Sequence, residues 1–152
     1  MKKLLILLTL TLPFNLYALP NSLNEYISSN PTWKTDISSK SFMATRCSIV
    51  NIISSERVSE DPRPESKSLS EGFKTFSAIF ALYSDTLFTM GGGSKDNFKD
   101  RARHWAKLYG EEAVSNINNY NEMTRGDFGQ DLLFCNQIMY KFVEKDIKNI
   151  AN

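Results

Sequence analysis

His104 and Asp100 are the residues whose types and spacing come nearest to a catalytic arrangement. His104 is the only histidine of the 152-residue chain, and it follows Asp100 by four positions in the segment DNFKDRARHW. Residues four apart share a helix face, where a carboxylate can orient an imidazole for general-base catalysis. A hydrolase would also need an activated nucleophile, and the sequence contains no G-x-S-x-G motif. We interpret the pair as a surface contact, with a small exported hydrolase that uses His104 and Asp100 as an alternative.

A glycine run raises the question of a phosphate-binding loop. A P-loop ends in Gly-Lys-Ser/Thr and follows a strand. Here the run follows an apolar helical pattern, and Lys95 is followed by Asp96. The sequence therefore excludes a P-loop and predicts that one helix ends with positive φ angles before another begins at Ser94 or Asp96. The residues of this possible flexible loop are Gly91, Gly92 and Gly93.

The remaining acidic residues form no catalytic or metal-binding set. Asp127 and Asp131 stand where the last helix is expected to begin, and there they favour the positive end of the helix dipole. Glu111 and Glu112 are adjacent, so on a helix they point about 100° apart. With one histidine and no Cys-x-x-Cys motif, the sequence predicts no metal site and no cofactor.

The first 18 residues have the layout of a secretory signal peptide. Lys2 and Lys3 precede an apolar run over 4–12, Pro13 ends the run, and Ala18 offers a small residue for cleavage. The run is well below the about 20 residues that span a bilayer, so we expect no stable membrane span. The sequence predicts a protein of the periplasm or the extracellular space.

Cys47 and Cys135 are the two cysteines of the chain. An even number of cysteines in an exported protein favours a disulfide. Each cysteine lies on an apolar stripe, one in the first long helix and one in the last. We therefore predict one disulfide that clamps the two ends of the fold.

Composition excludes two further classes of function. Removal of residues 1–18 takes two of the 18 basic residues and none of the 17 acidic ones, which leaves a formal charge of −1. A strongly basic nucleic-acid-binding domain is excluded on this ground. A membrane-surface helix would need a basic face, and Glu144 and Asp146 interrupt the lysines of the last helix.

The positions of apolar residues predict an irregular N-terminal arm followed by one helical domain over 41–152. The arm, residues 19–40, is polar and is expected to pack on the domain through Trp33, with one helical turn near Leu23. The first long helix is expected to begin at Ser41 as N-cap and to fray near Val58, before the polar loop SEDPRPESKS.

The next helix is expected to begin with a capping box from Ser68 to Glu71 and to form the central element of the fold. Its apolar residues recur at helical spacing over so much of the circumference that other helices should surround it. One stripe consists of Phe73, Phe76, Phe80, Tyr83 and Leu87, and a second consists of Ile79, Leu82 and Met90.

The sequence predicts two further helices and a weak helix between them. One helix is expected to end at Gly110, and four asparagines within 111–125 indicate only a short or weak helix there. The last helix is expected over 128–150, with an apolar stripe that consists of Leu132, Cys135, Met139 and Phe142 and continues through Val143, Ile147 and Ile150. The predicted fold is an all-α, compact bundle of four to five helices.

These observations favour a non-enzymatic exported binding protein. It would act as a chaperone, an inhibitor or an assembly subunit on another envelope or extracellular protein. A second alternative is a carrier of a small ligand, with the aromatic residues of the central helix lining a cavity. Those residues are Phe73, Phe76, Phe80 and Tyr83.

Overall fold

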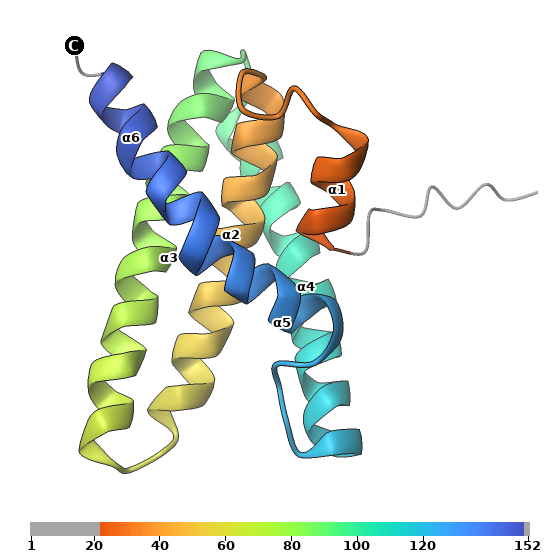
Figure 1. The fold of residues 1–152 in the computed structure, drawn as a ribbon, viewed down its shortest axis with the longest axis vertical. Helices are drawn as coiled ribbons and strands as arrows, with labels where there is room; N and C mark the ends of the chain where they lie inside the picture. Colours follow the sequence, from red (N-terminus) through yellow and green to blue (C-terminus); the bar gives the residue numbers. More distant parts are fainter. Residues whose placement is uncertain (1–21, 151–152) are drawn as a thin grey trace, which may run out of the picture.

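The computed structural model describes residues 22–150, and this part of the chain is helical and contains no strands (Figure 1). Because the last three helical segments run on without a break, the described residues form five helices. The predicted all-α fold of four to five helices is confirmed. The predicted signal peptide, residues 1–18, lies outside the described residues.

Helix α1, Leu23–Ser29, replaces much of the irregular arm that the sequence predicts. Ser22 caps it by accepting a hydrogen bond from the amide of Glu25 at 3.2 Å. Leu23 is fully buried, and Trp33 in the following turn is 4% exposed. The short helix therefore packs on the domain through Leu23, and the turn that follows it packs through Trp33, as expected.

Helix α2, Ile37–Ser59, begins four residues before the predicted N-cap. The cap is Asp36, whose carboxylate accepts from the amide of Ser39 at 2.6 Å. Ser41, expected to be the cap, is fully buried inside the helix. Helix α2 contacts α3, α4 and α5 and buries more side chains than any other described helix, so α2 is the central element instead of α3 (Figure 1).

Helix α3, Pro64–Met90, also begins earlier than predicted. Pro64 occupies the first turn, where its fixed φ suits a helix and its missing N–H costs nothing. Ser68 and Glu71 therefore lie inside the helix and do not cap it. The second predicted stripe is wrong at Leu82 and Met90, which are 70% and 58% exposed.

Helices α2 and α3 are antiparallel and join through a serine zipper, a row of paired serines that recurs once per heptad. In the two outer pairs each hydroxyl donates to the backbone carbonyl of its partner, over 2.6 to 3.0 Å. In the middle pair the hydroxyl oxygens lie 3.2 Å apart. Small side chains let the helices approach closely, and the reciprocal bonds fix their register. The pairs are Ser41–Ser84, Ser48–Ser77 and Ser55–Ser70.

Helix α4, Lys95–Tyr120, is capped by Ser94 as predicted but continues through Gly110. The weak helix expected over 111–125 is the second half of α4. It ends at Asn121, which adopts a left-handed φ of 54°. Asn116 has a packing role, because its side-chain amide donates to two carbonyls of the next loop at 3.1 and 2.9 Å.

The last helix consists of α5 (Gly126–Phe134), a π-helical turn (Cys135–Met139) and α6 (Tyr140–Ile150). It lies across α2 and α3 in Figure 1. We call its four fully buried residues at a strict spacing of four the inner stripe. The inner stripe consists of Asp131, Cys135, Met139 and Val143, each 0% exposed.

The π turn explains this spacing. In an ordinary α-helix, residues four apart rotate around the axis by about 40° per step, so a strict spacing of four would leave the interface. A π turn is wider and turns less per residue, which keeps the inner stripe on one line. The predicted stripe is wrong at Ile147, which is 44% exposed, whereas Leu132 and Phe142 are half-buried and pack against the core.

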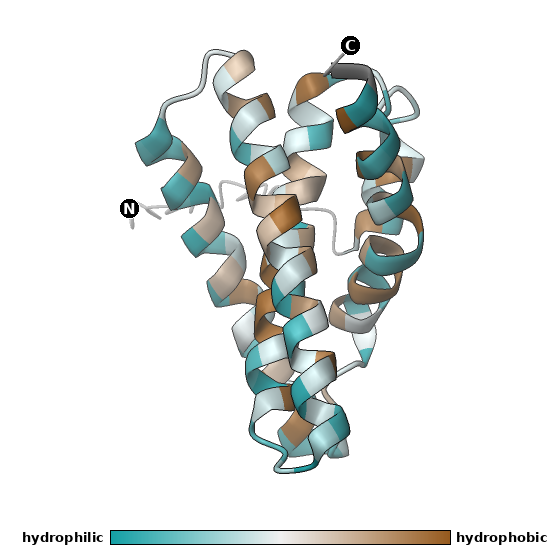
Figure 2. Ribbon diagram, turned by 90° about the vertical axis from the view of Figure 1, so that its left-hand side faces the viewer, coloured by the Kyte–Doolittle hydropathy of each residue, from teal (hydrophilic) through white to brown (hydrophobic). Residues whose placement is uncertain are grey.

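One hydrophobic core joins all five helices. Trp33, Phe80, Tyr109 and Phe128 bring it a large side chain from four different segments. Figure 2 shows hydrophobic residues recurring along each helix among hydrophilic ones, the pattern of helices that bury one face.

Candidate functional site

His104 and Asp100 lie one turn apart on the same helix, α4. His104 is exposed on α4, where its ring contacts Trp105 at 5.7 Å between centroids. Asp100 accepts a hydrogen bond from Arg103 at 2.8 Å. Within residues 22–150 no hydrogen bond or ion pair joins the imidazole to a carboxylate.

The aromatic residues of α3 contribute to packing. Phe80 is fully buried, Tyr83 is 3% exposed, and Phe76 packs on Tyr140 with 4.8 Å between ring centroids. The clearest depressions of the described surface lie elsewhere, between α1 and α5 and around the α2–α3 turn. None of these depressions is lined by the residues proposed for a ligand cavity.

The depression between α1 and α5 is open and polar. It is lined by hydroxyl, amide and carboxylate groups that include Tyr26, Asn30 and Gln130. Burial, aided by the negative charge of Glu25, raises the pKa of Asp127 above its ordinary value. The site offers hydrogen bonds without enclosing a ligand.

The glycine run forms a defined turn between α3 and α4. Gly91 ends α3, and Gly92 adopts a φ of 83°, so the predicted positive φ is confirmed at this position. Gly93 lies against the Phe88 ring, where a β-carbon would come within 2.3 Å of a ring atom. Two of the three glycines therefore have conformational or steric reasons to be glycine.

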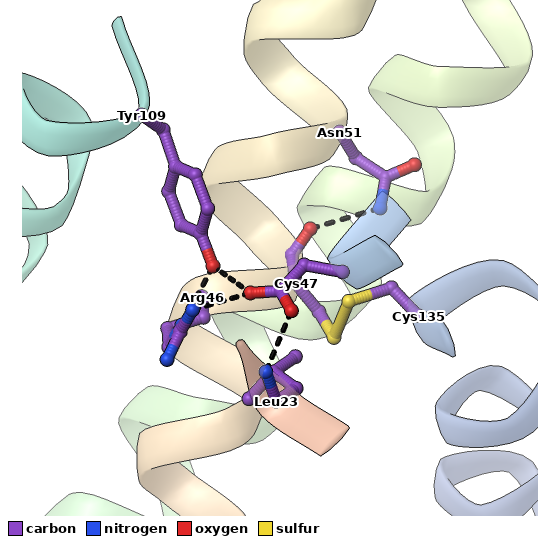
Figure 3. The surroundings of a disulfide bond; sticks show 7 residues. Leu23, Arg46, Cys47, Asn51, Tyr109 and Cys135 are labelled. Atoms are coloured by element: carbon purple, nitrogen blue, oxygen red, sulfur yellow. Dashed lines mark hydrogen bonds and ion pairs between the residues drawn. A yellow bond between two sulfur atoms is a disulfide. The ribbon is translucent and has the colours of Figure 1, made fainter. Parts of the chain in front are cut away.

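A buried polar network joins four helices, α1, α2, α4 and α5, at the centre of the molecule (Figure 3). The Arg46 guanidinium of α2 donates to the Asp131 carboxylate of α5 at 2.5 Å, and both side chains are 0% exposed. Arg46 also donates to the Tyr109 hydroxyl of α4 at 2.6 Å, and that hydroxyl donates to Asp131. The amide of Leu23 donates to the second carboxylate oxygen at 2.6 Å.

Aromatic rings enclose the guanidinium of this network. Its carbon lies 4.1 Å from the centroid of the Trp105 ring and 5.3 Å from that of Tyr109. Cation–π attraction is strongest where water is excluded, as it is here. The rings and the carboxylate together replace the water that Arg46 loses on burial.

Burial dominates the proton equilibria of the network. It raises the pKa of Asp131 above its ordinary value, while the Arg46 charge and three hydrogen bonds oppose the shift. Burial and the Asp131 charge raise the pKa of Tyr109, so its hydroxyl keeps the proton that it donates. The expected role of Asp131 at the helix dipole is therefore wrong, because its carboxylate is the centre of this network.

The predicted disulfide is present directly beside the network. The Sγ atoms of Cys47 and Cys135 lie 1.98 Å apart, and both residues are fully buried. Cys47 follows Arg46 in α2 (Figure 3), and Cys135 comes four residues after Asp131 in the last helix. A disulfide of this kind is typical of proteins in oxidising compartments.

A second polar contact holds the far end of the last helix. Asp146 accepts from Lys40 of α2 at 2.9 Å and from the Tyr83 hydroxyl of α3. Partial burial opposes the shift, but the hydrogen bonds from Tyr83 and Lys40 hold the pKa of Asp146 below its ordinary value of 3.8. The last helix is therefore fixed at both ends.

The opposite side of this helix carries what we call the outer stripe: Leu133, Gln137, Lys141 and Lys145. All four residues are exposed, and Leu133 is 57% exposed. They follow the same spacing of four as the inner stripe, offset by two residues, so the π turn aligns them as well. Ile138, beside Gln137, is 52% exposed.

Sequence reasoning missed the Arg46–Asp131 pair and the outer stripe. Arg46 stands next to Cys47 within an apolar pattern, and Asp131 begins the row of residues spaced by four that includes Cys135. A charged residue inside each of two apolar stripes is the signal that would have marked both residues as buried.

Two general tests of function complete the description. Within residues 22–150, no three side chains of His, Cys, Asp or Glu gather closely enough to hold a metal ion. No helix in the same range combines the length and the apolarity that crossing a bilayer requires. No family model matches the chain, and neither a curated protein nor a solved structure matches it.

Proposed function

We propose that the chain is an exported, non-catalytic binding protein that docks on another envelope or extracellular protein through the outer side of its last helix. The observation that carries the proposal is the exposure of Leu133 and Ile138 on either side of Cys135. These apolar side chains stand on the segment that the disulfide and the Arg46–Asp131 pair fix in place.

Energetics support a partner at this position. Burial of a leucine or isoleucine side chain contributes about 1.5–3 kcal/mol relative to its exposure. A rigid surface also loses little conformational entropy when a partner binds. Leu82 is more exposed, at 70%, but it stands on α3 away from the covalent anchor. Two apolar side chains on a preorganised helix therefore favour docking there.

Export is part of the same proposal. The pattern of residues 1–18 predicts a leader for the periplasm or the extracellular space. The buried disulfide is consistent with folding in an oxidising compartment. Both features support a partner that the chain meets outside the cytoplasm.

Site-specific photo-cross-linking in the envelope of the producing cell tests the proposal. A photoreactive amino acid at position 133 of the full chain is expected to give one discrete adduct with another protein. The same group at the exposed Thr75 of α3 is the control and should give none. Ile138→Asp should abolish the adduct, whereas Leu69→Asp, at a 53% exposed residue of α3, should not. Absence of an adduct at 133, or equal loss with both variants, would refute the proposal.

A further inference from the structure

The outer side of the last helix is more cationic than its sequence suggests. The sequence over 141–148 mixes Lys141, Lys145 and Lys148 with Glu144 and Asp146. In the structure Asp146 points inward to Lys40 and Tyr83 and is removed from the outer side. Residues that alternate in charge along the sequence therefore lie on different sides of the helix.

The remaining carboxylate is neutralised locally. Glu144 accepts a hydrogen bond from Lys148 at 3.1 Å, and both side chains are more than half exposed. Lys141 and Lys145 are exposed and form no ion pair within the described residues. The outer stripe thus carries two free positive charges at its α6 end.

The π turn fixes the position of the two lysines relative to Leu133 at the other end of the outer stripe. It aligns Leu133 with Lys141 and Lys145, because the wider turn compensates the rotation that a spacing of four produces in an α-helix. The outer stripe therefore begins with Leu133 and ends with two lysines, and Ile138 flanks it on the neighbouring side of the helix.

We propose that the occupant of this surface is an acidic amphipathic segment of the partner protein. The proposal rests on the proposed function and specifies the chemistry of the partner. Two apolar side chains of the segment would contact Leu133 and Ile138, and two carboxylates would face Lys141 and Lys145. Exposed ion pairs of this kind contribute chiefly to orientation and association rate, while the apolar contacts contribute most of the affinity.

The geometry favours a protein over an anionic membrane. The apolar side of this helix, including Met139 and Val143, is buried against α2 and α3 and is not available to enter a bilayer. Two lysines alone raise the affinity for an anionic surface by only about thirtyfold. Two exposed apolar side chains offer a small apolar area, which suits contact with a few side chains of another protein.

Binding of synthetic helical peptides to the full mature chain tests the proposal. One peptide presents two leucines followed by two glutamates at a spacing of four, and matched peptides carry glutamine or lysine instead. Fluorescence anisotropy at low salt should show the glutamate peptide binding at least tenfold more tightly than the glutamine peptide. Lys141→Glu with Lys145→Glu should reverse the preference toward the lysine peptide. The control, Lys67→Glu with Lys74→Glu on α3, has the same change in net charge and should alter affinity less than twofold.

Three outcomes would overturn the proposal: equal binding of the glutamate and glutamine peptides, equal weakening by the control variant, or binding to phosphatidylglycerol vesicles that depends on Lys141 and Lys145 and exceeds peptide binding. A cross-link from position 133 that persists in the Lys141→Glu, Lys145→Glu variant would leave the binding function standing and refute its acidic partner. Absence of any cross-link from position 133 in the chain that retains both lysines would refute the binding function itself.

Discussion

Arg46 and Asp131 form an ion pair beside the bond that joins Cys47 to Cys135, so α2 and the last helix are connected twice within one helical turn. The ion pair is fully buried and its carboxylate accepts three hydrogen bonds. Neither charge has access to water, which makes each partner dependent on the other.

Removal of one partner of this pair is expected to be severely destabilising. Asp131→Ala leaves the Arg46 charge buried and uncompensated, which costs about 3–5 kcal/mol of unfolding free energy. Urea denaturation at neutral pH measures the loss. The double variant Arg46→Met, Asp131→Leu removes both charges and should regain most of the stability. A double variant less stable than Asp131→Ala would contradict this account.

The disulfide is expected to stabilise the fold by about 2–5 kcal/mol. The variant Cys47→Ala, Cys135→Ala should show a clearly lower thermal midpoint than the oxidised chain. A reductant should lower the midpoint of the unchanged chain once the protein opens, and it should leave the variant unaffected. An unchanged midpoint in the variant would show that the covalent link adds nothing to the ion pair.

The serine zipper makes a size-dependent prediction at Ser84. Ser84→Ala removes the hydrogen bond that the Ser84 hydroxyl donates to the Ser41 carbonyl, together with its contacts to the Ser41 and Thr45 hydroxyls, and should cost about 1 kcal/mol. Ser84→Leu forces α2 and α3 apart and should cost about 1–3 kcal/mol more by overpacking. Ser68→Leu, at an exposed position of α3, is the matched control and should change stability by less than about 0.5 kcal/mol. Equal effects at Ser84 and Ser68 in urea denaturation would contradict close packing at the zipper.

The contact at Asp146 should be lost in acid. Its pKa is below the ordinary value of 3.8 in the folded protein, so the folded state favours the ionised form. The stabilisation is therefore complete above pH 3.8 and declines as the pH falls through the lower, folded pKa. Asp146→Asn should be less stable than the unchanged chain at pH 7, and the difference should shrink below pH 3.8. A difference in unfolding free energy that stays constant with pH would contradict this sign.

Alanine substitutions at the adjacent residues Gly91 and Gly92 are expected to change the stability of the fold by different amounts. Gly92→Ala places a side chain at a φ of 83° and should cost about 1–2 kcal/mol. Gly91→Ala is the control, because its β-carbon would meet only ordinary contacts at 3.5 Å. Thermal unfolding of the two variants measures the difference. Equal, small effects would mean that the turn is flexible enough to change its path.

The helical class could be predicted because apolar periodicity and composition are visible in the sequence. The number of helices agrees because α1 was not predicted, whereas the separate helix expected over 111–125 is part of α4. Helix ends were less predictable where a residue typical of loops stands next to residues that favour a helix. Pro64 resembled part of a loop although it begins α3, and Gly110 resembled a stop although the buried Tyr109 and Ala113 hold α4 together across it. In both cases packing against the core decided the boundary.

The candidate site was less accessible to sequence reasoning because it depends on pairings between distant segments. Nothing local indicates that Asp131 meets Arg46 or that Asp146 turns inward. The π turn changes the periodicity from which faces are inferred, and the α-helical pattern misplaces Ile147. The row of residues spaced by four from 131 to 143 is the local sign that a π turn is present.

The serine zipper also bears on the order in which the chain assembles. Its pairs are separated by 15 to 43 positions, whereas the disulfide joins residues 88 positions apart. Contacts between residues near in sequence form fastest, so we expect α2 and α3 to associate first. Alkylation of free thiols during oxidative refolding would follow the later step. Cys47 should remain a thiol until the last helix docks, so that oxidation marks the molecules that have completed folding.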